Sequence, residues 1–349
     1  MKKIYIISLF VVSFIVLSCG KEEALAPQQK IIIAAILDTT GHYSQFGKEV
    51  IRGMELYTRK YATSYELRFY DSKADANIAL AEFIKFAPNS YSRGVITLTS
   101  WVSNAIAEVA KSNRLVQFAV GSAVYNYSSL KNCVRFTSDL NDEIKYLSNY
   151  LNDYNRIAIM HFDNDYGDGW NNSLKSGLGG KVIGSFSYPD TMTQFTAILE
   201  KVKALNPDRL VLISTREAVQ IVRQAKAIGL NVQMIGTRPI LTDQLLATSE
   251  ANGLIFSYPD LNEQSPAYQD YVSRYGKKPS SFVAEGYDLC FGLDNAIKAN
   301  GTASANIWDW FSNNGYNGML GLIKFDSFAQ ASYTYNLNVI KDGDYILFP

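Results

Sequence analysis

Residues 156–178 read RIAIMHFDNDYGDGWNNSLKSGL, and this stretch decides the fold because a strand, a tight corner and a helix follow one another in it. The run RIAIMHF at 156–162 is short and apolar, as in a buried β-strand. WNNSLKSGL at 170–178 has a helical pattern, and Gly167 lets the chain turn tightly between the two. The stretch therefore predicts a βα unit with Tyr166 at its corner.

The acidic residues of this corner raise the question of a metal loop or a catalytic carboxylate pair. An EF-hand loop beginning at Asp163 needs glycine at its sixth position and glutamate at its twelfth, and these positions hold Asp168 and Leu174. A catalytic pair drawn from Asp163, Asp165 and Asp168 stays open as an alternative, although no partner group accompanies it. We therefore expect no metal here and interpret the corner as part of a ligand-binding mouth.

The same alternation of strand and helix extends through most of the chain. The expected strands are 31–37, 66–71, 94–99, 115–120, 156–162, 181–188, 209–214, 232–236 and 253–258. The expected helices are 47–61, 77–87, 103–112, 142–151, 194–205, 217–228, 266–275, 282–299 and 305–313. Strands that are apolar throughout belong to parallel sheets covered on both faces. The fold class is thus α/β, with two doubly wound blocks whose ligands lie beyond the carboxyl ends of the strands.

The N-terminus has the features of an export signal. Lys2 and Lys3 precede an uncharged apolar run that is shorter than the roughly 20 residues of a membrane-spanning helix. The run ends in VLSCG, which resembles a lipoprotein cleavage site with Cys19 as the lipidated residue. We expect a signal peptide at 1–18, a lipidated tether at 19–29 and a protein anchored in the cell envelope; an ordinary secretory signal with an incidental cysteine is the alternative.

Composition excludes several classes of function. The 33 basic and 33 acidic residues leave no net charge, and no basic stripe offers a surface for nucleic acid. The sequence contains no GxSxG, Walker A or GxGxxG motif after the first strand, and its two histidines, His42 and His161, stand in no metal or catalytic motif. Cys133 and Cys290 are expected to be two buried thiols, with a single disulfide between them as the alternative. We expect neither an enzyme nor a bound cofactor.

At this point the chain resembles the type I periplasmic binding proteins of the branched-chain amino-acid ABC transport family. The resemblance rests on the stretch from His161 to Gly236, and on TTGHYSQFGKEVIRGMEL, YDSKADANIALAEFI, GVITLTSWVSNAIAEVAKSNRLVQFAV, GYDLCFGLDNAIKANG and LGLIKFDSFAQ. It implies two α/β lobes joined by three hinge crossovers. The implied lobe 1 is 30–138 with 261–322, lobe 2 is 139–260 with 323–349, and the crossovers lie near 137–139, 258–261 and 325–327.

The resemblance also implies a ligand site between the lobes. Its carboxylate-binding serine falls on Ser100, where a helix N-terminus with free N–H groups favours an anion; an ordinary helix cap is the alternative for this residue. A carbonyl and a hydroxyl fall on Gly121 and Ser122. The aromatic positions and an added apolar wall fall on Phe46, Tyr166, Tyr287 and Trp101.

Two positions depart from the amino-acid binders. Arg238 stands where an acidic residue would hold the ligand ammonium, and Ser214, followed by Thr215 and Arg216, stands where a tyrosine is expected. A guanidinium repels an ammonium, so a cleft-facing Arg238 would favour a ligand with an acid or polar acceptor at that end. The alternative is that both arginines, Arg216 and Arg238, are solvated on the surface.

The resemblance implies a solute-binding lipoprotein that captures a small, carboxylate-bearing ligand and delivers it to an ABC permease. Two other hypotheses keep the fold. In one, it recognises a protein in the envelope, such as a cell-wall synthase, and an occluded cleft would favour this. In the other, it is a sensor that reports to a membrane receptor. An enzyme would need a cluster of titratable groups in the cleft.

Overall fold

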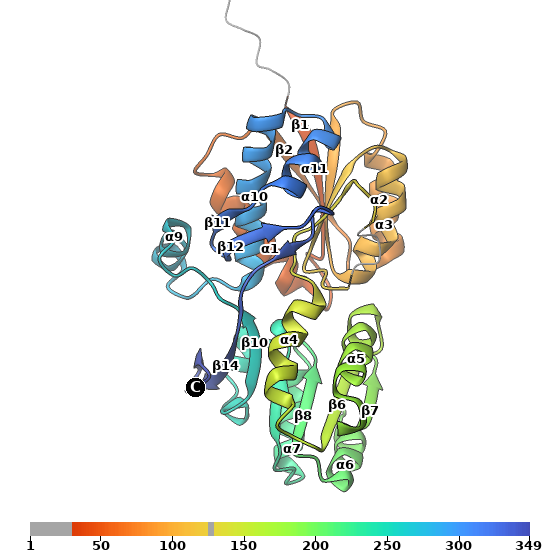
Figure 1. Ribbon diagram of the computed structural model, residues 1–349, viewed down its shortest axis with the longest axis vertical. Helices are drawn as coiled ribbons and strands as arrows, with labels where there is room; N and C mark the ends of the chain where they lie inside the picture. The colour runs from red at the N-terminus through yellow and green to blue at the C-terminus, as the bar shows by residue number, and fades with distance from the viewer. Residues whose placement is uncertain (1–29, 125–128) are drawn as a thin grey trace, which may run out of the picture.

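A computed structural model describes residues 30–124 and 129–349, which form two lobes stacked along the long axis of the molecule (Figure 1). The expected signal peptide at 1–18, Cys19 and the tether at 19–29 lie outside the described residues. Within the described residues, no helix combines the length and the apolar character that crossing a membrane requires.

The first lobe is built on a parallel sheet of order β2-β1-β3-β4-β5. Alternate residues of β1 face opposite sides of this sheet because side chains alternate along a strand. Ile32, Ala34 and Ile36 pack against two helices on one face, and Ile33 and Ala35 pack against three helices on the other. The strands are β1 (Ile31–Leu37), β2 (Tyr65–Asp71), β3 (Ser92–Leu98), β4 (Val116–Val120) and β5 (Cys133–Arg135).

The helices of this lobe lie in two layers (Figure 1). One layer consists of α2 (Ala76–Phe86) and α3 (Ser100–Ser112), and the other of α1 (Ser44–Thr58), α10 (Ser281–Asn300) and α11 (Ser304–Asn313). Helices α1 and α10 approach closely because glycines face each other's backbone. A Cβ on Gly53 would lie 2.0 Å from the Val283 carbonyl oxygen, and a Cβ on Gly286 would lie 2.1 Å from that of Val50. This packing fixes the two helices that supply much of the site.

The second lobe contains a sheet of order β15-β14-β10-β9-β8-β6-β7, parallel from β10 to β7 and antiparallel at β14 and β15. Its strands are β6 (Ile157–Phe162), β7 (Val182–Tyr188), β8 (Arg209–Ile213), β9 (Gln233–Gly236), β10 (Ile255–Pro259), β14 (Tyr335–Lys341) and β15 (Asp344–Leu347). Both faces are covered. Ile157 and Ile159 of β6 pack with α4 and α5, and Ala158 and Met160 pack with α6 and α7.

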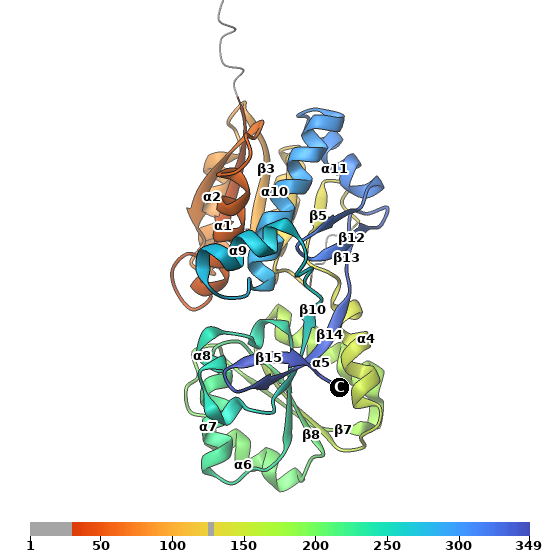
Figure 2. The same ribbon diagram turned by 90° about the vertical axis from the view of Figure 1, so that its left-hand side faces the viewer.

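The remaining elements connect or extend the lobes. The helices of the second lobe are α4 (Leu140–Leu151), α5 (Asp165–Leu178), α6 (Thr196–Leu205), α7 (Ala218–Ala227) and the short α8 (Asp243–Leu246), with 3-10 turns at Gly179–Lys181, Arg238–Ile240 and Ser249–Ala251. Helix α9 (Pro266–Tyr275) projects at the side, where Figure 2 shows it beside α1 and α10. A small sheet of β11 (Tyr316–Gly318), β12 (Gly321–Phe325) and β13 (Ala331–Ser332) packs on the first lobe.

The chain passes between the lobes three times, after β5, after β10 and before β14 (Figure 2). The predicted α/β class, with two parallel-sheet lobes joined by three crossovers, is therefore confirmed. For the third passage the strand pairing supports a later position than the one expected near 325–327. Because β12 and β13 still pair within the small sheet of the first lobe, we propose that the boundary lies at Tyr333–Thr334.

Candidate functional site

A small cavity of about 40 Å³ lies between the two lobes, at the carboxyl ends of the parallel strands. It is lined by Tyr43, Phe46, Leu98, Thr99, Ser100, Trp101, Gly121, Phe162, Asn164, Tyr166, Thr215, Arg238, Pro239 and Phe282. Both lobes contribute, as expected where the loops of two doubly wound sheets converge. This volume is well below the roughly 300–1,000 Å³ of sites that enclose small molecules, and direct contacts between the lobes surround it, so the lobes are closed on each other in this structure.

The N-terminus of α3 forms the polar end of this cavity. Thr99 precedes the helix with a φ of 67°, a strained conformation for a residue with a Cβ, and its buried hydroxyl has no hydrogen-bond partner in the described structure. Ser100 begins the helix and does not cap it. Its Oγ instead accepts a hydrogen bond of 3.3 Å from the Val124 amide. The first amides of a helix lack intrahelical partners and carry a partial positive charge, so this end suits an anion.

Aromatic rings form the walls. Phe46 of α1 stacks on Phe282 of α10 with ring centroids 4.5 Å apart. The ring of Tyr43 packs edge-on against Trp101, with ring centroids 5.1 Å apart. It packs in the same way against Phe162 of the other lobe, with centroids 6.4 Å apart. Hydrogen bonds hold two of the wall residues in place: the Trp101 indole donates to the Ala74 carbonyl at 2.8 Å, and the Tyr166 hydroxyl donates to Thr237 Oγ1 at 2.9 Å. Such walls suit a ligand with an apolar or aromatic body.

Arg238 lines the cavity, but its charge is already paired. Its Nη1 donates to Glu285 Oε1 of α10, and its guanidinium lies 4.7 Å from the centroid of the Phe282 ring. Both members of this pair are nearly inaccessible, with 4% and 0% of their side chains exposed. Burial alone would lower the pKa of Arg238, but the charge of Glu285 raises it well above its ordinary value. The hypothesis of a free surface arginine is therefore wrong for Arg238.

Glu285 is the centre of a network that joins the lobes near the hinge. It accepts hydrogen bonds from Thr137 Oγ1 at 2.9 Å, from the Tyr333 hydroxyl at 3.0 Å and from the Gly121 amide at 3.1 Å. Gly121 has a φ of 60°, and a Cβ there would lie 2.6 Å from Leu98 Cδ1. The carboxylate thus ties two hinge segments, the end of β4 and the second lobe to one point on α10.

A second set of contacts crosses between the lobes at the rim of the cavity. Arg216 Nη1 donates to the His42 carbonyl at 3.1 Å, and the His42 ring pairs with Glu217. The Tyr43 hydroxyl donates to Asp190 at 3.3 Å. Arg216 is exposed, in agreement with the alternative that it is a surface residue. These contacts join the two lobes beside Tyr43 and Thr215 of the cavity lining.

The structure brings together six of the nine residues expected at the ligand site, namely Phe46, Ser100, Trp101, Gly121, Tyr166 and Arg238. Ser122 and Ser214 are fully buried beside the cavity without lining it. Tyr287 lies elsewhere: its ring meets that of Tyr57 at 5.4 Å. On a helix with 3.6 residues per turn, Phe282 and Glu285 share the face toward the cavity, while Tyr287 is rotated away from it.

Sequence reasoning missed Tyr43, Phe162, Thr215, Phe282 and Glu285. A helical projection of residues 281–300 would have placed Phe282 and Glu285 on one face, but it could not have shown which face of the helix meets the second lobe.

The acidic corner at residues 163–168 has a local role. Asn164 caps α5 by accepting from the Gly167 amide at 3.0 Å, and Asp163, Asp165 and Asp168 are exposed. Among the described residues, no cluster of three or more His, Cys, Asp or Glu side chains could hold a metal ion.

Residues 30–344 match the sequence model of a protein family described as periplasmic binding protein. The chain belongs to the periplasmic binding protein family. Among curated proteins, none matches this sequence significantly.

Solved structures of periplasmic binding proteins and related receptors share this fold. An extracellular ligand binding receptor from Desulfohalobium retbaense is 30% identical with a TM-score of 0.87; the match covers 91% of this chain and 59% of that receptor. A leucine binding protein from Thermotoga maritima is 21% identical, with a TM-score of 0.83 and coverage of 91% and 98%. A solute binding protein from R. palustris in complex with benzoate is 17% identical, with a TM-score of 0.83 and coverage of 91% and 95%.

Proposed function

We propose that this periplasmic binding protein is an extracytoplasmic solute-binding lipoprotein that captures a small carboxylate ligand between its lobes and delivers it to an ABC importer. The observation that carries the proposal is the convergence of the α3 N-terminus and the aromatic walls on one cavity between the lobes. Among the described residues lining this cavity, none is a His, Cys, Lys, Asp or Glu. This supports a binding role rather than general acid–base catalysis.

The arrangement favours an aromatic or apolar monocarboxylate. The ligand carboxylate would lie at the α3 N-terminus near Ser100, and its body would lie between Tyr43, Trp101 and Phe162. Two of the similar solved structures contain benzoate and 3,4-dihydroxybenzoic acid, which are ligands of this kind. Because Glu285 neutralises Arg238, the cavity lacks both a free carboxylate for the ammonium of leucine and a free cation for a second acid group.

Ligand entry requires the lobes to part. Even a single aromatic ring with a carboxylate needs several times the 40 Å³ present in the closed arrangement. The three connections between the lobes are short segments at the ends of elements, which are the positions that absorb hinge motion. We propose that the protein alternates between an open form that admits ligand and a closed form that encloses it.

The envelope location and the importer partner are part of the same proposal. Cys19, outside the described residues, would carry the lipid and tether the protein beside a permease.

The test is a calorimetric panel of benzoate, phenylacetate, leucine and succinate on the purified protein and on Ser100→Ala. We expect an aromatic acid to bind best and Ser100→Ala to weaken it about tenfold, as for the loss of one charge-assisted hydrogen bond. The matched control is Ser112→Ala at the other end of α3, where the hydroxyl donates to the Glu108 carbonyl. Leucine as the tightest ligand, or equal affinity in Ser100→Ala, would contradict the proposal.

A second candidate function is protein recognition or sensing by the same fold. The small cavity and the buried Arg238–Glu285 pair favour it, because the pair joins the lobes and the cavity is smaller than sites that enclose small molecules. Small-angle scattering separates the two candidates. A solute-binding protein binds one of the acids, and this ligand compacts a variant whose lobes have been opened, whereas a recognition module binds none of the acids and none of them changes its shape.

A further inference from the structure

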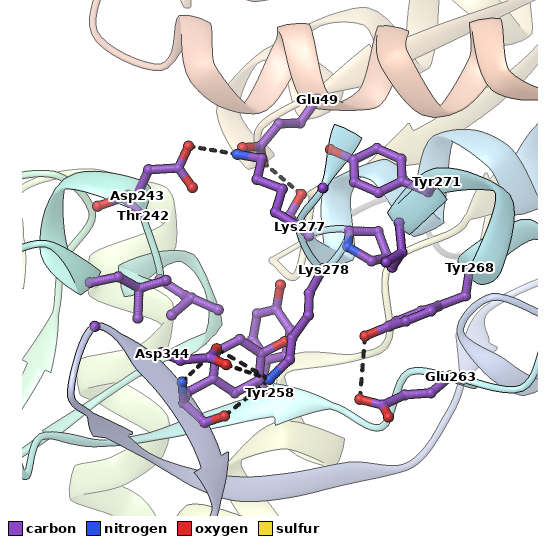
Figure 3. Close-up of a pocket in the computed structure, with 18 of the residues that line it drawn as sticks. Glu49, Thr242, Asp243, Tyr258, Glu263, Tyr268, Tyr271, Lys277, Lys278 and Asp344 are labelled. Carbon is purple, nitrogen blue, oxygen red and sulfur yellow. Dashed lines mark hydrogen bonds and ion pairs between the residues drawn. The ribbon is translucent and has the colours of Figure 1, made fainter. Parts of the chain in front are cut away.

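A second and larger cavity, of about 680 Å³, lies between the lobes beside the hinge (Figure 3). Helices α1 and α9 and the segment 276–280 line it from the first lobe, and α8, β10 and β15 line it from the second. It shares no lining residue with the cavity of the proposed function. Its volume is in the range of sites that enclose small molecules.

Glu49 presents a buried carboxylate to this cavity. The residue is 8% exposed, and it accepts hydrogen bonds from Ser280 Oγ at 2.7 Å and from Gln45 Nε2 at 3.0 Å. Within the described ranges, no Lys, Arg or His nitrogen lies within 4.0 Å of its oxygens. Buried charges in proteins are normally paired, because an isolated one loses its hydration without compensation. Among the described residues, the Glu49 carboxylate therefore has no direct ion-pair partner.

The nearest lysines form their close ion pairs with other carboxylates across the cavity, and Lys277 acts on Glu49 only through space. Lys277 Nζ lies 2.6 Å from Asp243 of α8, and Lys278 Nζ lies 3.0 Å from Asp344 of β15. Figure 3 shows these two pairs at opposite ends of the cavity, with Glu49 beside Lys277. The exposed Glu263 adds a further carboxylate to the lining. With two lysines against four carboxylates, the lining has an excess of acidic groups.

Tyrosine rings supply the rest of the wall. Tyr268 and Tyr271 of α9, Tyr258 of β10 and Tyr345 of β15 bring rings from three elements into the cavity lining. Lys278 Nζ already lies 4.5 Å from the centroid of the Tyr345 ring, so this wall holds an ammonium group against an aromatic face. Such faces attract cations through the quadrupole of the ring.

From these contacts we propose that the second cavity binds a small organic cation, with its ammonium group at the Glu49 carboxylate and its apolar part between the tyrosine rings. Because residues of both lobes line the cavity, the bound cation would contact both.

Proton linkage gives the proposal a distinctive signature. Burial raises the pKa of Glu49, the hydrogen bonds from Ser280 and Gln45 lower it, and the opposite charges of Asp243 and Lys277 have opposing effects. Arg52, one turn further along α1, is hydrogen-bonded to Tyr271 at 3.4 Å. A bound cation stabilises the ionised carboxylate, so binding releases a proton, and affinity rises as the pH rises through the raised pKa.

The experiment is calorimetry of benzylammonium chloride, with benzyl alcohol as the uncharged probe, on the purified protein and on Glu49→Gln. We expect benzylammonium to bind, benzyl alcohol to bind at least about tenfold more weakly, and Glu49→Gln to remove this preference. Titration in two buffers of different ionisation enthalpy should report proton release in the wild type and none in Glu49→Gln. Thermal unfolding verifies that the variant is folded.

Matched variants separate this site from the first. Glu55→Gln makes the same change on a partly exposed carboxylate of α1 that is paired with Arg59 outside the cavity lining, and it should alter affinity less than about twofold. Ser100→Ala should weaken acids in the first cavity and leave benzylammonium binding unchanged, so failure of the proposed function does not decide this proposal. No binding of benzylammonium to the wild type, equal binding of benzyl alcohol, or unchanged affinity in Glu49→Gln would overturn it.

Discussion

Substitution of Glu285 by Gln tests the pair that joins the two lobes. The change removes the charge from a side chain with no exposed surface and leaves the Arg238 guanidinium unpaired, with only 4% of its side chain exposed. Removing the charge of one partner of a buried ion pair costs about 3–5 kcal/mol of stability, because the remaining charge has neither hydration nor a counter-ion. The carboxamide oxygen of Gln can still accept from Thr137 and Tyr333, but its NH2 group cannot accept from the Gly121 amide, so the change removes the charge and one further hydrogen bond.

The substitution destabilises the closed form and not the open form. Arg238 follows β9 in the second lobe and Glu285 lies on α10 in the first, so opening the hinge exposes the guanidinium to water. A penalty of about 3–5 kcal/mol changes the ratio of closed to open molecules by roughly a hundredfold to several thousandfold. We therefore expect Glu285→Gln to be open without ligand, and its ligand affinity to fall in proportion.

The assay is small-angle scattering of the ligand-free protein, with thermal unfolding of the same samples. Glu285→Gln should have a larger radius of gyration than the wild type, and Arg238→Met added to it should restore much of the lost closure by removing the orphaned charge. The control is Asp243→Asn, which breaks the exposed bridge to Lys277 and should cost at most about 1 kcal/mol. Unchanged scattering and unfolding in Glu285→Gln would refute the reasoning.

Three further predictions concern other parts of the molecule. Burial raises the pKa of Asp38 from 3.8 to about 6, so its contribution to stability is present below pH 4 and is lost as the pH rises through 6. Asp38→Asn should remove this loss, and at pH 8 its free energy of unfolding in urea should exceed that of the wild type by about 2–3 kcal/mol. The same dependence of stability on pH in both proteins would count against this prediction. Gly53→Ala should cost about 1–3 kcal/mol because its Cβ would meet the Val283 carbonyl, whereas Gly180→Ala, with open space around it, should be nearly neutral in thermal unfolding; equal melting temperatures would contradict the packing argument. Cys19→Ser should move the exported protein from the detergent phase to the aqueous phase, and equal partitioning of both forms would reject lipidation.

The order of strands and helices followed from the sequence alone. The nine strands expected from short apolar runs begin and end within two residues of their observed bounds. The reason is clearest for β1 and β6, which are buried on both faces and apolar along nearly their whole length. Helix starts were less well determined: α1 and α3 begin three residues earlier than their periodicity indicated. Periodicity alone missed Ser100 as the first residue of α3, whereas the family resemblance implied this position; the residue lines the cavity.

Only the tertiary structure decided what the site residues do. Arg238 was expected to be either a ligand-binding cation or a surface residue, and it is instead paired with Glu285, 47 positions away, because the hinge brings the second lobe onto one face of α10. Tyr287 is turned away from that face by the rotation of the same helix. Periodicity along a chain reports which side chains are buried, but the partner of a buried charge depends on segments that approach one another only when the lobes close.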